Sequence, residues 1–371
     1  MKIIIPKQEL LKAVNTVKSI VSQKSALPIL SHILMEADDN KLKLTTTDLK
    51  VSIECVVECT VEVTGSLTVS SQRLSMILGE LPDEDVTLEL LEANIVELRC
   101  GKKVETKLFS ISPDEYPPVR DFEGIEPIVF NQSVLKKLFQ RTSFAICTDQ
   151  SRYNLTGLLL ETRSDGLRVV ATDGRRMSFA VSDEDIPTDR EIKVIIPSKM
   201  IRELESLLED NSEKIVKVYL DSNQASFLFD HVRVVTALIE GNFPNYEAVV
   251  PKKHDKEIII NLQKFMESMR RAYAMTNDKF RNVKLTFSEG KLLLTVKTPE
   301  VGDYKEELPI SYENDTFDIS FNPLFVIDVL RYMDSENVCM QLKDGSSPGV
   351  FKPYIEAPVD TYVNVVMPIR S

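Results

Sequence analysis

Apolar positions along the chain follow two periods that alternate in a fixed order. The short apolar run Lys2–Ile5 predicts a strand, and apolar residues spaced three and four apart from Lys7 to about Ser22 predict a helix. Alternating residues then predict strands at Ile33–Ala37, Leu42–Thr46 and Val51–Val57. The first 60 residues therefore have the order strand, helix and three strands.

The same order recurs along the whole chain. Strand–helix pairs start near residues 4, 69, 129, 195, 259 and 320, so a unit of about 60–65 residues occurs six times. The later helices are expected at 72–81, 133–146, 198–208, 262–275 and 323–333, with Ser70 or Ser71 as the cap of the first of these. Two units make a domain of usual size. We therefore expect an α+β protein of three similar domains, at 1–124, 125–251 and 252–371.

The stretch Arg152–Ala180 shows the strand pattern most clearly. Strands are expected at Arg152–Thr162, Leu167–Thr172 and Arg175–Val181, separated by turns at Ser164–Gly166 and at Asp173-Gly174. Two arginines directly after the second turn are compatible with a phosphate-binding site or with two solvated side chains. Thr47-Asp48-Leu49 occupies the same position in the first domain, which indicates that the turn is first a structural element of the repeat.

Composition excludes several classes of protein. The chain of 371 residues is 43% hydrophobic and 27% charged, which is ordinary for a globular protein. No apolar run approaches the roughly 18 residues of a membrane helix, and the N-terminus does not resemble a signal peptide, so a cytoplasmic location is expected. Five scattered cysteines do not suggest a disulfide framework, and Cys55 and Cys59 lack two further ligands at zinc spacing. The three histidines have no partner in a recognisable catalytic frame. No metal or cofactor is expected.

Charge is distributed unevenly between helices and strands. The formal net charge is -12, yet the six predicted helices together carry +5, which leaves -17 on the strands and loops. This contrast suggests a helical surface that meets a polyanion and an acidic outer surface formed by the sheets. Six helices packed side by side at about 9 Å would enclose a hole of only about 7 Å, whereas twelve would leave about 24 Å, enough for duplex DNA. One chain is thus expected to form half of a ring, whose unpaired sheet edges a second copy could pair.

The chain resembles a known family over its whole length, the bacterial DNA sliding clamp, which is the beta subunit of DNA polymerase III. The resemblance rests on seven stretches in order: Ala26–Leu30, Leu44–Leu49, Arg152–Gly157, Ala171–Met177, Asn242–Tyr246, Asn277–Arg281 and Val365–Arg370. It implies a non-enzymatic processivity factor of DNA replication. It also implies three clamp domains in a head-to-tail homodimeric ring around double-stranded DNA, with the helices lining a central hole and antiparallel sheets outside.

The resemblance further implies a pocket between the second and third domains that binds short linear peptides. Its expected partners are the DNA polymerase III alpha subunit, the clamp loader, other DNA polymerases and mismatch repair proteins, with no membrane partner. The implied pocket residues are Leu155, Thr172, Gly174, Arg175, Arg176, Met177, Pro244, Val249, Asn322, Phe325, Val365, Met367, Pro368, Ile369 and Arg370. Leucine, valine, proline and methionine would provide an adaptable apolar cleft, and Arg176 could hold polar atoms of the peptide. Arg175 stands where a histidine is common and Ala248 where an arginine is common, which affects the detailed peptide preference.

DNA contacts and the seam between the two copies are the remaining implied sites. By resemblance, Lys24 and the loop Thr148-Asp149-Gln150 face DNA. Basic side chains on the helices complete the DNA candidates, which are Lys24, Arg73, Lys136, Lys137, Arg141, Gln150, Lys199, Arg202 and Arg270. At the seam, Lys107, Phe109 and Ile111 of one chain are expected to meet Ala274 and Met275 of the other.

Two other functions compete with a sliding clamp. An enzyme acting on a phosphorylated substrate at Asp173–Arg176 would need a nucleophile or a metal cluster, and the sequence shows neither these nor a glycine-rich phosphate loop. An acidic scaffold without a role on DNA would be expected to be a monomer.

Overall fold

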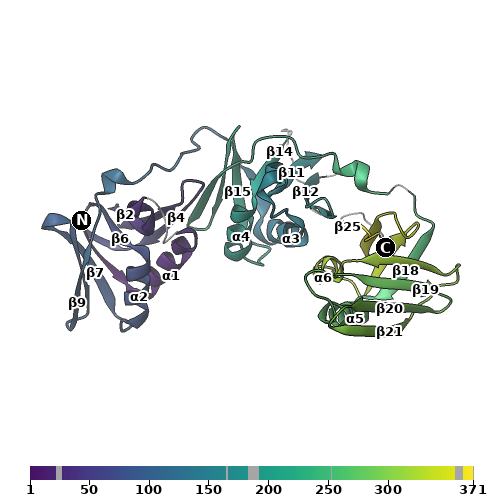
Figure 1. Ribbon diagram of the computed structural model, residues 1–371. Helices are drawn as coiled ribbons and strands as arrows, with labels where there is room; N and C mark the ends of the chain where they lie inside the picture. Colours follow the sequence, from purple (N-terminus) through teal and green to yellow (C-terminus); the bar gives the residue numbers. More distant parts are fainter. Residues whose placement is uncertain (22–26, 164–165, 183–191, 252, 356–361, 371) are drawn as a thin grey trace. The chain divides into compact units, whose positions relative to one another are not determined.

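The computed structural model describes residues 1–21, 27–163, 166–182, 192–251, 253–355 and 362–370. The chain divides into two compact units, which are described separately. Unit 1 comprises Met1–Ser133 and Arg202–Leu238, and unit 2 comprises Val134–Ile201 and Ile239–Ser371 (Figure 1). Helices and antiparallel sheets make up both units, as expected for an α+β protein.

The sixfold order of strand, helix and three strands is confirmed. The first two repeats are β1 (Lys2–Pro6), α1 (Lys7–Val17), β2 (His32–Asp38), β3 (Lys41–Thr47), β4 (Val51–Glu58), then β6 (Gly65–Ser70), α2 (Ser71–Glu80), β7 (Asp85–Leu91), β8 (Ile95–Cys100), β9 (Val104–Phe109), with an additional β5 (Thr60–Val63) between them. The next two are β10 (Ile128–Asn131), α3 (Gln132–Thr142), β11 (Gly157–Arg163), β12 (Gly166–Thr172), β13 (Arg176–Val181), then β14 (Lys193–Pro197), α4 (Ser198–Leu207), β15 (Ile215–Leu220), β16 (Gln224–Phe229), β17 (Val232–Ala237). The last two are β18 (Lys256–Asn261), α5 (Leu262–Ala274), β19 (Val283–Ser288), β20 (Lys291–Thr298), β21 (Gly302–Pro309), then β22 (Phe317–Phe321), α6 (Pro323–Arg331), β23 (Asn337–Leu342), β24 (Gly349–Tyr354), β25 (Tyr362–Val366).

Each helix begins within two residues of the end of the preceding strand, and polar side chains cap several of these starts. Ser70 is the N-cap of α2, and its side chain accepts a hydrogen bond from the backbone N–H of Arg73 at 3.5 Å. Asn261 and Asn322 cap α5 and α6 in the same way, and Pro323 then occupies the first position of α6. Because a cap satisfies an N–H that the helix cannot, these residues fix the strand-to-helix switch.

Strand pairing interlocks the two repeats of a domain. The first strand of each repeat joins the three strands of the other, so β1 lies beside β7 and β6 lies beside β2. The last strands of the repeats then connect the four-stranded halves: β4 pairs with β17 in unit 1, and β13 pairs with β25 in unit 2. As a result, neither repeat of a pair can complete its sheet alone.

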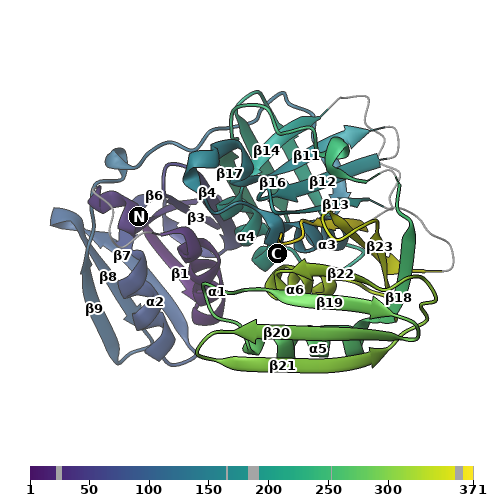
Figure 2. The same ribbon diagram turned by 45° about the vertical axis from the view of Figure 1, so that its right-hand side comes forward.

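The helices cover the sheets and bury their apolar side chains against them. In unit 1, α1 packs against α2 and β4, and in unit 2, α5 packs against α6 and against β20 and β21 (Figure 2). The buried face of α5 includes Phe265, Met269 and Ala272, spaced three and four apart. None of the helices among the described residues is long and apolar enough to cross a membrane.

The stretch before β11 differs from the prediction of a strand starting at Arg152. Gln150–Leu155 is instead a short 3₁₀ segment, and β11 starts at Gly157. The Asp149 carboxylate accepts the N–H of Ser151 at 3.0 Å, which starts a turn in place of a strand. Gly157 is the first residue that fits beside β14, because a Cβ there would lie 2.5 Å from the Ile196 carbonyl oxygen. The turn expected at Ser164–Gly166 lies partly outside the described residues.

Candidate functional site

The turn between β12 and β13 positions the central arginines of the candidate site. The Asp173 Oδ1 atom accepts the N–H groups of Arg175 and Arg176 at 2.8 and 2.9 Å, and the Thr172 hydroxyl donates to the Arg176 carbonyl at 2.7 Å. Gly174 has a φ of +81°, which favours glycine. A Cβ at Gly174 would also lie 2.8 Å from Nη1 of Arg152.

The first domain contains the same turn, as the sequence duplication predicts. The Asp48 Oδ1 atom accepts the N–H groups of Lys50 and Val51 at 2.9 and 2.7 Å, and the Thr47 hydroxyl donates to the Val51 carbonyl at 3.2 Å. Leu49 has a φ of +73° at the position of Gly174. The turn is therefore a structural element of the repeat.

Arg176 is bound within the protein on several sides. Its Nη1 donates to Oδ2 of Asp328 on α6 at 2.7 Å, its Nε to Oδ2 of Asp173 at 3.2 Å, and its Nη2 to the Phe144 carbonyl at 2.6 Å. The guanidinium also lies 4.5 Å from the ring centroid of Phe325. The Arg176 side chain is only 12% exposed. Arg176 therefore holds β13 to α6, and most of its hydrogen-bonding capacity is already used.

This part of unit 2 contains a cavity of about 560 Å³, which lies within the range of about 300–1,000 Å³ that ligand sites usually have. Its lining residues come from the loop before β11, the turn at Asp173, the loop after α5, the start of α6 and the chain's end. They are Ile146, Cys147, Thr148, Asp149, Arg152, Asp173, Arg175, Arg176, Asp278, Lys279, Arg281, Asn322, Phe325 and Ile369. Five of the expected pocket residues, Arg175, Arg176, Asn322, Phe325 and Ile369, thus line one cavity.

The cavity is rich in charge and carries an excess of cations. Five arginines and lysines face three aspartates, and Arg281 is paired with Asp278. In the described part of the chain, neither Arg175 nor Lys279 has a carboxylate partner. The backbone N–H of Ser151 holds the pKa of the exposed Asp149 carboxyl below its usual range, so this group is an anion at neutral pH. An anionic group of a ligand would have two uncommitted cations available here.

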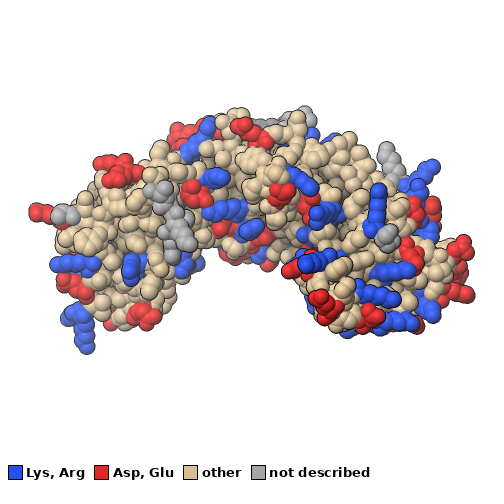
Figure 3. Space-filling model, viewed as in Figure 1, with Lys and Arg blue, Asp and Glu red and all other residues tan. Residues whose placement is uncertain are grey.

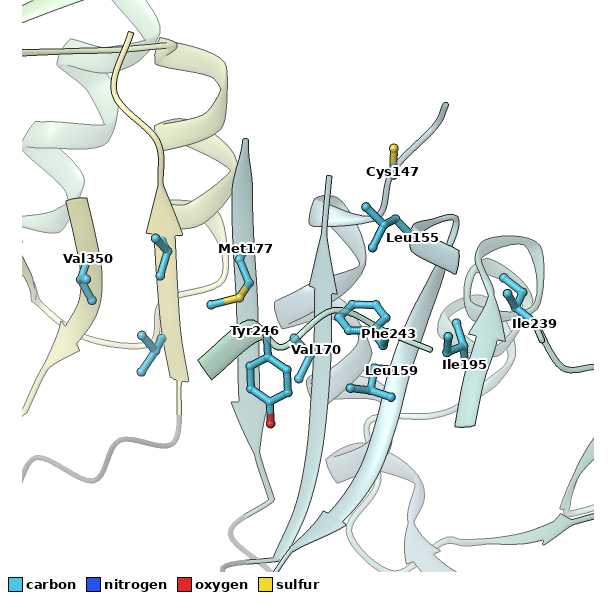
Figure 4. Packing of buried hydrophobic residues seen from close by; sticks show 12 residues of the cluster. Cys147, Leu155, Leu159, Val170, Met177, Ile195, Ile239, Phe243, Tyr246 and Val350 are labelled. Atoms are coloured by element: carbon cyan, nitrogen blue, oxygen red, sulfur yellow. The ribbon is translucent and has the colours of Figure 1, made fainter. Parts of the chain in front are cut away.

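The apolar residues expected in the pocket divide into buried and exposed sets. Leu155, Met177 and Val365 are at most 8% exposed and belong to a cluster that extends across β11, β12, β13, β24 and β25 (Figure 4). Val249 and Met367 are instead 44% and 39% exposed. The buried set supports the cavity wall, and the exposed set provides apolar surface for a ligand.

The segment carrying Pro244 and Val249 is held to the sheet by two aromatic anchors. Phe243 and Tyr246 are buried in the same cluster (Figure 4), which leaves Pro244 and Val249 exposed on either side of Tyr246. The Tyr246 hydroxyl donates to the buried Glu161 carboxylate and accepts a hydrogen bond from Arg168 Nη1 at 3.3 Å. Burial, followed by the hydrogen bond with Glu161, raises the pKa of Tyr246 to about 12. The remaining pocket candidates lie close in sequence to these elements: Thr172 in the turn, and Pro368 and Arg370 after β25.

The DNA candidates lie mainly on exposed helix surfaces, with some exceptions. Arg73, Lys199, Arg202 and Arg270 are exposed on helices, Gln150 is exposed in its loop, and Lys136 is half-buried. Lys24 lies outside the described residues.

Two cations of α3 share a single carboxylate partner. Lys137 and Arg141 both bind Asp334, at 2.8 and 3.0 Å, and Arg141 also lies over the Tyr362 ring. Arg141 is therefore a structural contact as well as a DNA candidate. On the face shown in Figure 3, Lys and Arg side chains lie among Asp and Glu side chains.

The seam candidates lie on β9, in the segment after it, and at the end of α5. Phe109 is 84% exposed, Lys107 and Ala274 are exposed, and Met275 is half-buried. Ile111 packs against a small cluster of Ile29, Leu30 and Tyr116 in its own chain.

Sequence reasoning did not identify Cys147, Arg152 and Lys279 as cavity residues. Lys279 does lie within the stretch Asn277–Arg281 that carries part of the family resemblance, which is the one signal that could have found it. Among the described residues, no group of histidines, cysteines and carboxylates could hold a metal ion.

Comparison with known proteins accounts for the entire chain. Family models for the DNA polymerase III beta subunit match in order: the N-terminal domain over residues 1–120, the central domain over 129–245 and the C-terminal domain over 247–370. A protein of Pseudomonas putida named "Beta sliding clamp" is 32% identical over 99% of both chains. One of Chlamydia muridarum with the same name is 29% identical over 100% of this chain and 99% of its own.

Solved structures agree with the sequence relatives. The DNA polymerase III subunit beta of Pseudomonas aeruginosa superposes with a TM-score of 0.94 at 31% identity, and each chain is covered completely. The DNA polymerase sliding clamp of Bacillus subtilis gives 0.95 at 28% identity, over 100% of this chain and 99% of its own. The chain therefore belongs to the DNA polymerase III beta subunit family, and it is a DNA sliding clamp with the three-domain clamp fold, a processivity subunit that is not itself an enzyme.

Proposed function

We propose that two copies of the chain close head to tail into a ring that encircles duplex DNA in the cytoplasm. The domains of each copy would span 1–124, 125–251 and 252–371. The observation that carries this proposal is the pairing of the last strand of each repeat. Four of the six repeats pair this strand with the last strand of another repeat, whereas β9 and β21, the last strands of the other two, lie at the edge of a sheet in the described part of the chain. Exposed sheet edges pair readily with another chain, and the 84% exposure of Phe109 on β9 supports such a contact.

The grip on DNA would be topological, with the helices toward the duplex. Exposed cations on several helices, including Arg73, Arg202 and Arg270, would contact phosphates singly and without base recognition. Because the net charge of the chain is -12, attraction to DNA has to come from such local groups and should weaken with salt. Weak contacts of this kind permit sliding.

The test of the ring uses DNA topology. The chain is loaded onto nicked circular DNA by a clamp loader, transferred to high salt, and the DNA is then cut once. We expect retention on the circle and rapid loss from the linear product with free ends. Equal retention on both forms would rule out encirclement, and a sedimentation mass of one chain at micromolar concentration would rule out the dimer.

We further propose that the unit 2 cavity and its apolar flank bind short linear peptides. The partners would be the DNA polymerase III alpha subunit, the clamp loader, other DNA polymerases and mismatch repair proteins. Arg175 and Lys279 would receive an acidic or polar group of the peptide, and the exposed side chains of Met367 and Val249 would contact its apolar residues. Arg176 would fix the shape of the wall more than it contacts the ligand.

Binding of a labelled peptide from the C-terminal region of a replicative polymerase tests this site. Arg175→Ala should raise the dissociation constant about tenfold, the cost of one charge-assisted hydrogen bond of roughly 1.5 kcal/mol. Deletion of residues 367–371 should weaken binding further, while the sedimentation coefficient of the ring stays unchanged. The matched control is Lys291→Ala, an exposed cation at the start of β20 that does not line the cavity. Equal affinities for Arg175→Ala and the control would contradict the assignment.

A further inference from the structure

Unit 1 contains a second cavity, which the functions proposed above do not use. Its volume is about 350 Å³, within the usual range of ligand sites. It is lined by residues of α1, of the strands β4, β16 and β17, and of the segment that starts at the end of α4 (Figure 2). Its apolar lining residues are buried or half-buried, whereas four of its five carboxylate and lysine residues are exposed. The cavity therefore has an apolar interior and a charged rim.

The internal repeat allows part of this lining to be matched with residues of unit 2. The helix α3 starts 125 positions after α1, and α6 starts 125 positions after α4. The strand pairs correspond in the same way, because Cys55 faces Val232 where Ala180 faces Tyr362, and Cys55 and Ala180 each follow the equivalent turns at Thr47 and Thr172 by eight residues. The matched pairs are Lys12 with Lys137, Thr16 with Arg141, Cys55 with Ala180, Leu207 with Tyr332, Glu209 with Asp334, and Val232 with Tyr362.

In unit 2, the protein's own side chains occupy the corresponding place. Arg141 and Lys137 bind the Asp334 carboxylate at 3.0 and 2.8 Å, and the Arg141 guanidinium lies 5.0 Å from the ring centroid of Tyr362. The Arg141 side chain is 11% exposed and Tyr362 is 2% exposed. Tyr332 adds a second ring at this position. The place is therefore filled by a planar cation that lies over an aromatic ring and binds a carboxylate.

The counterparts in unit 1 are shorter and leave the place open. Thr16 stands for the arginine, and Val232 and Leu207 stand for the two tyrosines, so none of them supplies a cation or an aromatic ring. Burial raises the pKa of the Cys55 thiol to about 11, so this group is neutral at neutral pH and adds to the apolar lining. An apolar cavity that shortened side chains leave can take up an aromatic molecule in their place.

The rim retains the carboxylate and adds others. Its charged residues are the carboxylates Glu9, Glu209 and Asp230 and the lysines Lys12 and Lys214. Lys214 binds Glu209 at 2.6 Å and Asp230 at 3.0 Å, and Glu9 has no cation partner in the described part of the chain. Asp334 of unit 2 binds two cations at once, so its counterpart Glu209 can accept a second cation beside Lys214. The rim therefore favours a cationic ligand over an anionic one.

We propose that the unit 1 cavity binds a small organic cation that has a planar charged head on an aromatic body. The head, a guanidinium or an amidinium, takes the place that the Arg141 guanidinium has in unit 2 and binds Glu209. The aromatic body takes the place of the Tyr362 ring and packs over Val232. The site is formed within unit 1 of one chain, so it depends neither on closure of a ring nor on the peptide cavity of unit 2.

Three ring compounds of equal size test the chemistry of the site. Benzamidine carries an amidinium on a ring, benzamide is its neutral counterpart, and benzoate is its anionic counterpart. Their dissociation constants for the full chain are measured by ligand-observed NMR titration. We expect benzamidine to bind at least about fivefold more tightly than benzamide, as one charge-assisted hydrogen bond implies, and benzoate to bind most weakly. Equal affinities for benzamidine and benzamide, or tighter binding of benzoate, would overturn the proposal.

Variants of the lining assign the binding to this cavity. Thr16→Arg combined with Val232→Tyr copies the filling of unit 2 and should weaken benzamidine binding at least about tenfold. Glu209→Gln removes the carboxylate without filling the space and should weaken it about fivefold, which keeps the test decisive if the double variant does not fold. The matched control is Glu80→Gln, an exposed carboxylate at the end of α2 that does not line the cavity. Unchanged binding in Glu209→Gln, or an equal loss in the control, would refute the site.

A blocked arginyl-tyrosine dipeptide distinguishes two sources of such a cation. It presents a guanidinium and a ring as a segment of a partner protein would. Binding tighter than that of benzamidine would identify an arginine side chain of another protein as the occupant, and weaker binding would identify a free small molecule. In both cases the affinity should fall at least about fivefold in Glu209→Gln, and binding of both probes that persists in this variant would contradict the proposal.

Discussion

Removing the Arg176 side chain should destabilise unit 2 rather than simply weaken ligand binding. The guanidinium binds Asp328, Asp173 and the Phe144 carbonyl, and lies over Phe325. Arg176 and Asp328 are both only 12% exposed. An alanine would leave the Asp328 carboxylate partly buried without its main counter-charge.

The magnitude follows from the environment of the remaining carboxylate. Removing one partner of a buried ion pair costs about 3–5 kcal/mol. Asp328 would keep a second contact to the half-exposed Arg331 at 3.3 Å, so the lower end of that range applies. We therefore expect Arg176→Ala to lower the free energy of unfolding by about 3 kcal/mol. With a urea dependence of about 3 kcal/mol per molar, the midpoint would fall by about 1 M.

Urea unfolding at fixed protein concentration measures this effect. The chain has no tryptophan and ten tyrosines, so far-ultraviolet circular dichroism and tyrosine fluorescence are the appropriate signals. Arg175→Ala removes the adjacent, exposed arginine and should change the free energy by less than about 0.5 kcal/mol. Asp328→Asn and the double variant complete a cycle, in which the two single losses should add to much more than the loss of the double variant. Equal midpoints for Arg176→Ala and Arg175→Ala would refute the structural role of Arg176.

Three further outcomes test other parts of the structure. Gly174→Ala should cost about 1–2 kcal/mol and more than Gly124→Ala in urea unfolding, because both have positive φ but only the first brings a Cβ within 2.8 Å of another atom. Tyr246→Phe should cost about 1–2 kcal/mol, since the buried Glu161 carboxylate would lose its hydroxyl donor and keep the hydrogen bond from Arg163 at 3.1 Å. The hydrogen bond from Arg271 holds the pKa of Glu306 at about 2, below its ordinary 4.5, so its stabilisation is present above pH 4.5 and lost as the pH falls toward 2. Glu306→Gln should therefore flatten the pH dependence of the urea midpoint between pH 5 and 3.

The sequence predicts the repeat well because local signals coincide there. Apolar side chains at helical spacing follow an apolar strand, and capping residues such as Ser70 and Asn322 mark each switch. The strand β21 gave no such signal. Its sequence, Gly302–Pro309, is largely polar, and even its inner side chain Glu306 is an anion bound to Arg271. An edge strand of this kind has no apolar alternation to detect.

The site could be predicted only in part. The turn at Asp173-Gly174 is a local feature, and the sequence identified it together with its duplicate at Asp48. The role of Arg176 depends on Asp328, which lies 152 residues further along the chain, so no local pattern could show that the two side chains pair. Because Arg176 pairs with Asp328, a side chain that was predicted to contact the ligand instead stabilises the wall of the cavity.

The two junctions between last strands, β4 with β17 and β13 with β25, show how a repeated chain can avoid joining itself incorrectly. Seven residues after the threonine that starts each of the equivalent turns, Thr47 and Thr172, the unit 1 junction pairs Glu54 with Arg233 and the unit 2 junction pairs Phe179 with Val363. Exchanging strands between the two junctions would place Glu54 opposite Val363, or Phe179 opposite Arg233, so that a charge would face an apolar side chain. Since the order of strands and helix is the same in the six repeats, these side chains are what distinguish the correct partners, and the assembly of the sheets depends on differences between the repeats as much as on their similarity.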